Sequence, residues 1–274
     1  MALRLLHVSD LHFGRHSVTA QVEGVERLFA SEKFDAIVVS GDLSQRTRAA
    51  EFERARVFLD GAANHAPVLV VPGNHDTAWW TAPMGIGSVP AMYTRYRKYV
   101  SDELEPVLRI PGATIVGLNS AHGIRSFTQT MRPRDLSVVG ALRAEQWEKA
   151  KREFEGAKPG ELKVLVFHHN LLRGDLSNRW GLSSRARGIN GAVSTGADLV
   201  LCGHDHQADV QGVNVERKTM VVACASTLTT RVRGGGPGAI NVIEVDEKTI
   251  QVDVLQWSND AKSFARVMWA RYSR

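Results

Sequence analysis

Five short groups of aspartate, asparagine and histidine recur along this 274-residue chain, and each directly follows an apolar run. The groups are Asp10-Leu11-His12, Gly41-Asp42, Gly73-Asn74-His75-Asp76, His168-His169 and Gly203-His204-Asp205-His206. Taken singly, each group is weak evidence, because such combinations are also common in polar turns. Their occurrence together, always after an apolar run, predicts that they form one shared site.

The residue types in these groups indicate metal chemistry. Carboxylates, a side-chain amide and imidazoles suit divalent ions such as Mn²⁺, Fe²⁺, Zn²⁺ or Co²⁺, and the absence of cysteine excludes a thiolate zinc site. Seven ligands exceed what one catalytic ion with open positions uses. They suit two ions about 3.5–4 Å apart, which clamp a phosphate and activate a bridging water. The predicted ligands are Asp10, His12, Asp42, Asn74, His168, His204 and His206.

The elements that must position these residues alternate between strand-like and helix-like patterns. Strands rich in Val, Ile and Leu, without clean polar alternation, are expected at residues 3–8, 36–40, 68–71, 114–118, 163–167 and 198–202. Helices are expected around residues 22–29, 52–59 and 143–155. This order predicts an α/β layered domain. Because the carboxyl ends of the strands share one rim in such a sheet, the five groups are expected to converge there.

The rest of the chain divides into C-terminal strands and one aromatic segment. Strands are expected at residues 220–225, 239–245 and 249–256, with a hairpin turn at 246–248 and a flexible loop at 231–238. Residues 77–109 are expected to form a cap or helical excursion, with a helix near 88–100 whose aromatic side chains mostly pack. No linker or repeat divides the chain, so a single domain over residues 1–274 is expected. Homodimerisation through 77–109 stays open.

Composition and charge narrow the class of protein. Apolar residues make up 43% and charged residues 23% of the chain, which is typical of a globular protein. No apolar run approaches the ~20 residues of a membrane span, and no secretory signal is evident, so a cytoplasmic location is expected. Cys202 and Cys224 are expected to be buried free thiols. A net charge of +5 is too small to predict a stable nucleic-acid partner, and the arginines at 173–187 and 231–233 are expected to be mostly solvated.

The motifs resemble those of the calcineurin-like metallophosphoesterases. The pattern of that family is Asp-x-His, Gly-Asp, Gly-Asn-His-Asp/Glu, a strand-terminal His and Gly-His-x-His, and it is matched within residues 5–206. The resemblance implies a four-layer α/β/β/α sandwich, in which the strands of residues 215–274 complete the second sheet. It also implies two metal ions, with Mn²⁺ or Fe²⁺/Fe³⁺ favoured over Zn²⁺ and Co²⁺.

The resemblance further implies a role for each residue. The seven ligands would divide between two metals that share Asp42: Asp10, His12 and His206 for the first, and Asn74, His168 and His204 for the second. His75 would stabilise charge on the phosphoryl oxygens or protonate the leaving oxygen. Asp76 would orient His75 or the loop that carries Asn74. Of the two adjacent histidines, His168 is expected to be the ligand.

Within the family, residues 6–14 (Leu-His-Val-Ser-Asp-Leu-His-Phe-Gly) and the single-domain length of the chain look similar to those of bacterial class III cyclic nucleotide phosphodiesterases. We therefore expect hydrolysis of cyclic nucleotides or related phosphodiesters through a metal-bridging hydroxide. A pyrophosphohydrolase of the UDP-diacylglucosamine type, a phosphomonoesterase and a nuclease are alternatives, although lipid A pathway hydrolases carry Arg where His75 stands. An inactive metal-binding scaffold is the alternative of another class, and intact ligands at seven positions argue against it. The expected partner is a small phosphate ester, either nucleotide or lipid-linked.

Overall fold

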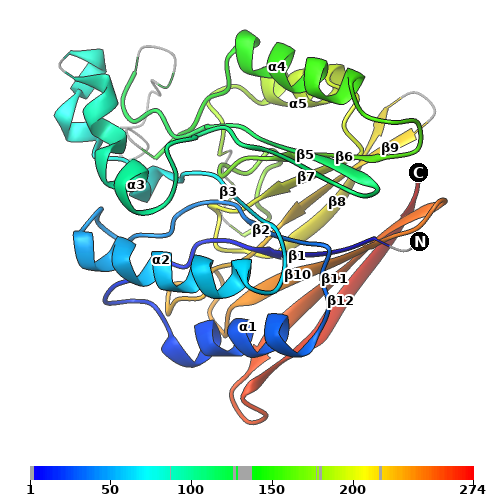
Figure 1. Ribbon diagram of the computed structural model, residues 1–274, viewed down its shortest axis with the longest axis horizontal. Helices are drawn as coiled ribbons and strands as arrows, with labels where there is room; N and C mark the ends of the chain where they lie inside the picture. Colours follow the sequence, from blue (N-terminus) through cyan, green and yellow to red (C-terminus); the bar gives the residue numbers. More distant parts are fainter. Residues whose placement is uncertain are drawn as a thin grey trace.

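Two six-stranded sheets pack face to face, with helices on both outer faces, in the computed structural model of this chain (Figure 1). The structure describes residues 3–86, 88–125, 128, 138–176, 178, 181–215 and 218–274. The layers follow the order helix, sheet, sheet, helix. The expected four-layer α/β/β/α sandwich is therefore confirmed.

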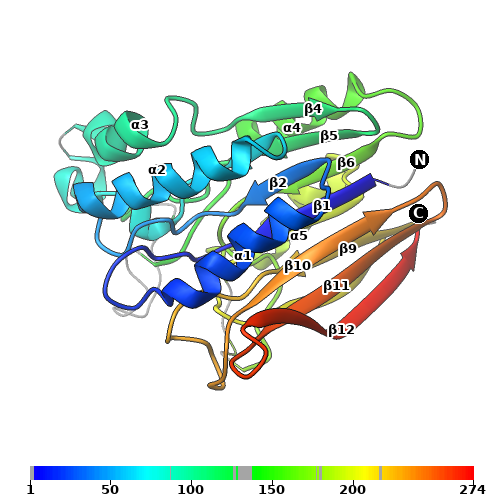
Figure 2. The ribbon, with the colours of Figure 1, turned by 60° about the horizontal axis from the view of Figure 1, so that its bottom comes forward.

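The first sheet contains the N-terminal strands, in the order β12-β11-β10-β1-β2-β3. Strands β1, β2 and β3 are parallel, and β10, β11 and β12 continue the sheet antiparallel on the other side of β1. The bounds are Leu3–Val8 for β1, Ala36–Val39 for β2, Val68–Val70 for β3, Ala239–Val245 for β10, Thr249–Ser258 for β11 and Ser263–Ser273 for β12. Helices α1 (Thr19–Ser31) and α2 (Ala49–Ala63) cover its outer face (Figure 2).

The second sheet has the order β4-β5-β6-β7-β9-β8. Strands β5, β6, β7 and β9 are parallel, while β4 and β8 pair antiparallel at the two edges. The bounds are Val107–Ile110 for β4, Ala113–Gly117 for β5, Leu162–Val166 for β6, Leu199–Cys202 for β7, Asp209–Val215 for β8 and Lys218–Cys224 for β9. Helices α4 (Ala144–Glu155) and α5 (Arg185–Ser194) lie on its outer face.

Burial on both faces explains the unbroken apolar runs of the central strands. Between the sheets, one core contains fully buried side chains such as Leu5, Val38, Val164, Leu201 and Ile243. Separate cores lie between the first sheet and its two helices, and between the second sheet and its two helices. Successive strand residues therefore enter one of two apolar layers, so no polar alternation marks these strands.

The C-terminal strands divide between the sheets, which corrects the expectation that residues 215–274 complete the second sheet. Only β9 joins that sheet, beside β7, whereas β10, β11 and β12 extend the first sheet from β1. Strand β10 fits beside β1 because its residues are buried on both faces, like those of β1. The hairpin expected at 246–248 joins β10 to β11 and is confirmed.

Three strands and one helix lie outside the sequence-based expectations. Strands β4, β8 and β12 are all sheet edges, and the burial of β8 and β12 is partial at best, so neither shows a continuous apolar run. Helix α5 contains Gly188 and Gly191, which weaken a helical pattern in the sequence.

Segment 77–109 differs from the single helix expected at 88–100. Its short α-helix, α3, is preceded by three 3-10 helices; the bounds are Trp79–Thr81, Pro83–Gly85, Val89–Tyr93 and, for α3, Thr94–Tyr99. Pro90 lies at the start of the last 3-10 helix, in a first-turn position where its missing amide hydrogen costs no hydrogen bond. Tyr93 and Tyr96 are buried, in keeping with the expected packing role, while Trp80 is 53% exposed.

Both cysteines are buried and free, as expected. Cys202 and Cys224 lie opposite each other on β7 and β9, with their Sγ atoms 3.0 Å apart. Among the described residues, no helix combines the length and apolar character that a membrane crossing requires.

Candidate metal centre

The predicted ligands follow β1, β2, β3, β6 and β7, and their strand ends meet at the end of the sandwich that lies away from both chain termini (Figure 1). Both sheets contribute, because β1, β2 and β3 belong to the first and β6 and β7 to the second. The structure brings all seven side chains together in two groups of three around a shared aspartate.

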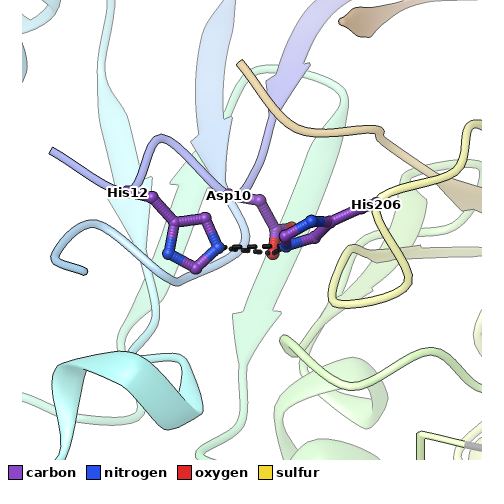
Figure 3. Close-up of side chains that lie close together, drawn as sticks. All are labelled: Asp10, His12 and His206. Carbon is purple, nitrogen blue, oxygen red and sulfur yellow. Dashed lines mark hydrogen bonds and ion pairs between the residues drawn. The ribbon is translucent and has the colours of Figure 1, made fainter. Parts of the chain in front are cut away.

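The first group contains Asp10, His12 and His206, whose side chains converge on one point (Figure 3). His12 Nε2 lies 3.0 Å from His206 Nε2. Asp10 Oδ1 lies 3.1 Å from His206 Nε2 and 3.5 Å from His12 Nε2. Three atoms that can bind a cation thus face one another, from the loop after β1 and the loop after β7.

The second group contains Asn74, His168 and His204. Asn74 Oδ1 lies 3.0 Å from His204 Nδ1 and 3.2 Å from His168 Nε2, and the two ring nitrogens are 3.2 Å apart. Here the three atoms come from the loops after β3, β6 and β7. Their spacing matches that of the first group.

Asp42 lies between the two groups. Its Oδ2 atom is 3.5 Å from His12 Nε2 in the first group and 3.3 Å from His168 Nε2 in the second. Its other oxygen, Oδ1, accepts a hydrogen bond of 2.8 Å from the backbone amide of His75. One carboxylate oxygen is therefore oriented by the backbone, and the other reaches both groups.

The donor set fits two metal ions. Ligand atoms bound at about 2.1 Å to one ion are separated by about 3.0–3.4 Å in octahedral or tetrahedral arrangements, and most of the spacings within each group fall in this range. Asp10 Oδ1 is buried and accepts no well-formed hydrogen bond from the described residues. Nδ1 of His168 and Nδ1 of His206 each donate to a backbone carbonyl, of Ser40 and Arg231, so their Nε2 lone pairs remain for a cation.

The backbone is unusual at most of these ligands. Five have a positive φ, at 54° for Asp10, 41° for His12, 52° for Asp42, 72° for His204 and 56° for His206. Few non-glycine residues adopt this left-handed conformation, and such conformations cluster at functional sites, where the surrounding structure enforces them.

Two glycines permit the close packing of these loops. A Cβ atom on Gly73 would lie 2.1 Å from Asp42 Oδ1, and one on Gly203 would lie 2.4 Å from Asp10 Oδ2. Glycine is therefore required directly before Asn74 and His204 because another loop passes against its Cα.

Burial and neighbouring charges shift the titration of the site. Burial raises the pKa of Asp42, but the nearby His168 and His75 more than reverse this and hold it below its usual value. Burial lowers the pKa of His168, yet Asp42 and Asp10 raise it to about 10. Burial lowers the pKa of His204 to about 3. Two buried carboxylates therefore attract positive charge strongly to the point between the groups.

His75 and Asp76 lie beside the ligands in different roles. His75 Nδ1 donates to the carbonyl of Gln45 at 2.8 Å, which leaves Nε2 as the nitrogen available to a substrate. Asp76 does not contact the His75 ring; its carboxylate accepts hydrogen bonds from three backbone amides, of Leu43, Ser44 and Gly73. Burial and Asp42 raise the pKa of Asp76 to about 6. These contacts join the loops after β2 and β3, so Asp76 orients the Asn74 loop rather than His75.

His169 packs against the ring of His204, with ring centroids 4.5 Å apart, but its ring nitrogens face other partners. Its Nδ1 atom lies 2.8 Å from Ser120 Oγ and its Nε2 atom lies 2.9 Å from the carbonyl of Val138. Both ring nitrogens of His169 are thus engaged elsewhere. These contacts support the expectation that the first of the two histidines is the ligand.

A cavity of about 750 Å³ opens beside the metal centre, with Asn74 and His75 in its wall. Four arginines also line it, and sequence reasoning missed three of them: Arg15, Arg46 and Arg48. Their positions in the sequence could have identified these arginines. Arg15 follows Asp10-Leu11-His12 within three residues, and Arg46 and Arg48 follow Asp42 within six. Arg231, expected to be solvated, lines the same cavity.

The other arginines singled out in the sequence do not reach this cavity where they are described. Arg233 pairs with Asp205 at 2.9 Å, and Arg173 donates to the carbonyl of Asn178. Arg187 is exposed. Arg179 and the side chain of Arg185 lie outside the described part of the chain.

The sequence matches the family described as calcineurin-like phosphoesterase over residues 3–208, so the chain belongs to this family. Members are dinuclear metal-dependent hydrolases that act on phosphate esters. The fold and the convergent ligand groups described above agree with this membership.

Individual relatives are more distant. A glycerophosphodiester phosphodiesterase, GpdQ, from Enterobacter lignolyticus is 37% identical over 87 residues, which are 26% of this chain and 29% of that protein. The purple acid phosphatase PPD1 of yellow lupin has a TM-score of 0.73 at 8% identity, with 100% of this chain and 54% of that chain covered. A structure of PhoD has a TM-score of 0.68 at 12% identity, with 99% and 70% covered. The chain thus spans about half of the lupin phosphatase, and its match to GpdQ spans under a third of that relative.

Proposed function

We propose that this chain is a dinuclear metal-dependent phosphodiesterase that hydrolyses cyclic nucleotides or related phosphodiesters. The observation that carries the proposal is the arrangement of two ligand groups around Asp42, with Oδ2 3.5 Å from His12 Nε2 and 3.3 Å from His168 Nε2. The partial match to a glycerophosphodiester phosphodiesterase supports a diester substrate.

The ligands divide as two sets around a bridging carboxylate. The first ion would be held by Asp10, His12 and His206 and the second by Asn74, His168 and His204, with Asp42 available to both. Imidazole, carboxylate and amide donors favour Mn²⁺ or iron, with Zn²⁺ and Co²⁺ as alternatives. When bound, the two ions polarise the phosphoryl group and lower the pKa of a water molecule.

The remaining chemistry belongs to the protein. Because Nδ1 of His75 donates to the carbonyl of Gln45, Nε2 carries a hydrogen only when the ring is protonated. In that imidazolium form, Nε2 would donate a hydrogen bond to a phosphoryl oxygen or give its proton to the departing alkoxide, which leaves the ring neutral. Asp76 holds the loops of Asp42 and Asn74 in register through three backbone amides. Neither role requires movement of the ligands.

The test compares Mn²⁺-loaded protein on bis(p-nitrophenyl) phosphate, p-nitrophenyl phosphate and cyclic AMP. We expect faster cleavage of the diester than of the monoester, inhibition by chelator, and hydrolysis of cyclic AMP. Asp42→Asn should reduce kcat/KM at least roughly 100-fold, since even residues behind metal ligands cost 10- to 100-fold. Asp60→Asn, on the exposed face of α2, is the matched control. A faster monoesterase, or full activity in Asp42→Asn, would contradict the proposal.

A further inference from the structure

The cavity beside the metal centre carries more positive charge than one scissile phosphate requires. Arg15, Arg46 and Arg231 line it together with His16, and all three arginines are exposed. Arg231 Nη2 lies 2.8 Å from His16 Nε2, which joins the loop after β1 to the loop after β9. These groups come from three separate loops, so the cluster is built by the fold rather than by one basic run.

The guanidinium groups have no carboxylate partners. No ion pair among the described residues involves Arg15, Arg46 or Arg231, whereas Arg233, two residues after Arg231, is paired with Asp205. Desolvation and the charges of Arg231, Arg15 and Arg46 together lower the pKa of His16. The cluster therefore presents unneutralised positive charge to the cavity.

One acidic side chain, Glu51, also lines the cavity, and it is hydrogen-bonded to the backbone instead of paired with an arginine. Glu51 Oε2 accepts hydrogen bonds from the backbone amides of Gln45, Arg46 and Arg48, at 3.2, 2.7 and 3.2 Å. It thereby caps the N-terminal end of α2. The Oε2 atom is thus occupied by backbone amides, and the single negative charge of Glu51 leaves the three arginines in excess.

The cluster lies next to the reacting position. The backbone carbonyl of Arg231 orients the predicted ligand His206, and the carbonyl of Gln45, beside Arg46, orients His75. Trp79 and Trp80 form a further wall of the same cavity, with ring centroids 6.0 Å apart, and Trp80 is half exposed. A ligand that extends from the metal centre therefore meets indole surface and guanidinium groups that form no ion pair with a described carboxylate, within one cavity.

We propose that the substrate carries a second phosphate group, bound by Arg15, Arg46 and Arg231, on an organic part that lies against Trp79 and Trp80. Planar guanidinium groups match the oxygens of a phosphate in paired hydrogen bonds, and a flat ring packs well on indole. The inference rests on the proposed phosphodiesterase function. It deepens that function by assigning the substrate class as a nucleotide-like diester with a remote phosphate.

A matched pair of substrates isolates the second phosphate. Thymidine 5′-(p-nitrophenyl phosphate) and its 3′-phosphorylated form share one scissile bond and one leaving group. We expect kcat/KM of Mn²⁺-loaded protein to be roughly tenfold higher for the 3′-phosphorylated ester, mainly through a lower KM. Arg46→Gln and Arg231→Gln should each reduce that ratio several-fold. Arg56→Gln, on the outer face of α2 and paired with Asp60, should leave the ratio unchanged.

The outcomes separate the two proposals. Equal kcat/KM for the two esters, or a ratio that the arginine variants do not alter, would overturn the second-phosphate site while the phosphodiesterase stands. Absence of turnover on both esters would instead count against the phosphodiesterase. In that case calorimetry with thymidine 3′,5′-bisphosphate and thymidine 5′-phosphate tests the cluster alone. Tighter binding of the bisphosphate that Arg46→Gln removes supports the site, and equal binding overturns it.

Discussion

The backbone amide of His204 donates a hydrogen bond of 2.9 Å to Oδ2 of Asp10, across 194 residues of chain. This contact uses one carboxylate oxygen of Asp10 for position and leaves Oδ1 facing His12 and His206. Asp42 is arranged in the same way, with Oδ1 on a backbone amide and Oδ2 toward the ligands. In both aspartates, a hydrogen bond from a backbone amide fixes the orientation of the carboxylate without a bound cation.

Replacement of His75 by alanine tests whether its ring acts on substrate or binds metal. A ring nitrogen of His75 also lies within 4.8 Å of ligand atoms of His12 and Asp42, so a ligand role is the competing interpretation. We expect kcat to fall roughly 10²- to 10⁴-fold, as for loss of a general acid, with metal content unchanged by elemental analysis. His65→Ala, at an exposed position, is the control. Loss of metal from His75→Ala would make the ring a ligand.

A methyl group at Gly73 should disturb the bridging carboxylate. Because its Cβ would lie 2.1 Å from Asp42 Oδ1, the Gly73→Ala variant must displace Asp42 or the loop before Asn74. We expect a loss of unfolding free energy of about 1–3 kcal/mol and weaker metal binding in titrations. Gly61→Ala in α2 is the matched control, since no atom lies within 4 Å of its added Cβ, and it should gain about 0.5–1 kcal/mol. Unaltered metal affinity in Gly73→Ala would refute this account.

Metal removal should lower the melting temperature. Cations bound to the folded chain would stabilise the five ligands with positive φ, which include the two buried aspartates. At a free concentration of 100 times its dissociation constant, one ion adds about 2.7 kcal/mol, which corresponds to roughly 5–10 °C for a chain of this size. Differential scanning fluorimetry with chelator, followed by Mn²⁺, measures the shift. Asp42→Asn should respond less, and an identical Tm with and without chelator in the native chain would argue against metal binding.

His7 should make the fold sensitive to acid. Burial lowers its pKa to about 3, and the neutral ring lies 2.9 Å from Ser40 Oγ and 3.2 Å from Asn241 Nδ2. Between pH 3 and pH 6.5 the unfolded chain binds this proton and the folded chain does not, so unfolding free energy falls as pH decreases through 6.5. The loss from His7 alone reaches about 1.4 kcal/mol near pH 5.5.

Urea unfolding at about pH 8 and about pH 5.5 measures this loss. Other buried histidines also titrate, so the comparison is the difference in pH dependence between the native chain and His7→Gln, which lacks the ionisable ring. Between the two pH values, we expect the unfolding free energy of His7→Gln to fall by about 1.4 kcal/mol less than that of the native chain. An equal loss in both proteins would show that His7 is protonated in the folded state.

The central strands of both sheets were predictable from the sequence, and the reason is physical. Strands β2 and β7 are buried on both faces and therefore have unbroken apolar runs. For β1 and β10, the predicted and observed bounds coincide. Convergence within each sheet followed because parallel strands end at one rim, whereas the meeting of the two rims depends on how the two sheets pack.

Other features depend on contacts between distant residues that no local pattern encodes. The pairing of His7 with Asn241, which places β10 in the first sheet, is one of these. The edge strands β8 and β12 lack the burial that produces an apolar signal. Arg15, Arg46 and Arg231 are gathered only by the folded loops. The single-domain extent, the cytoplasmic location and homodimerisation stay predictions.

Each ligand group contains residues from both sheets: Asp10 and His12 meet His206, and Asn74 meets His168 and His204. The two cations would therefore link the two sheets at the end of the sandwich where the ligand loops meet. Any motion that separates the two sheets at this end must also separate the ligands of each group. Catalytic activity would therefore report whether the two sheets are in contact there.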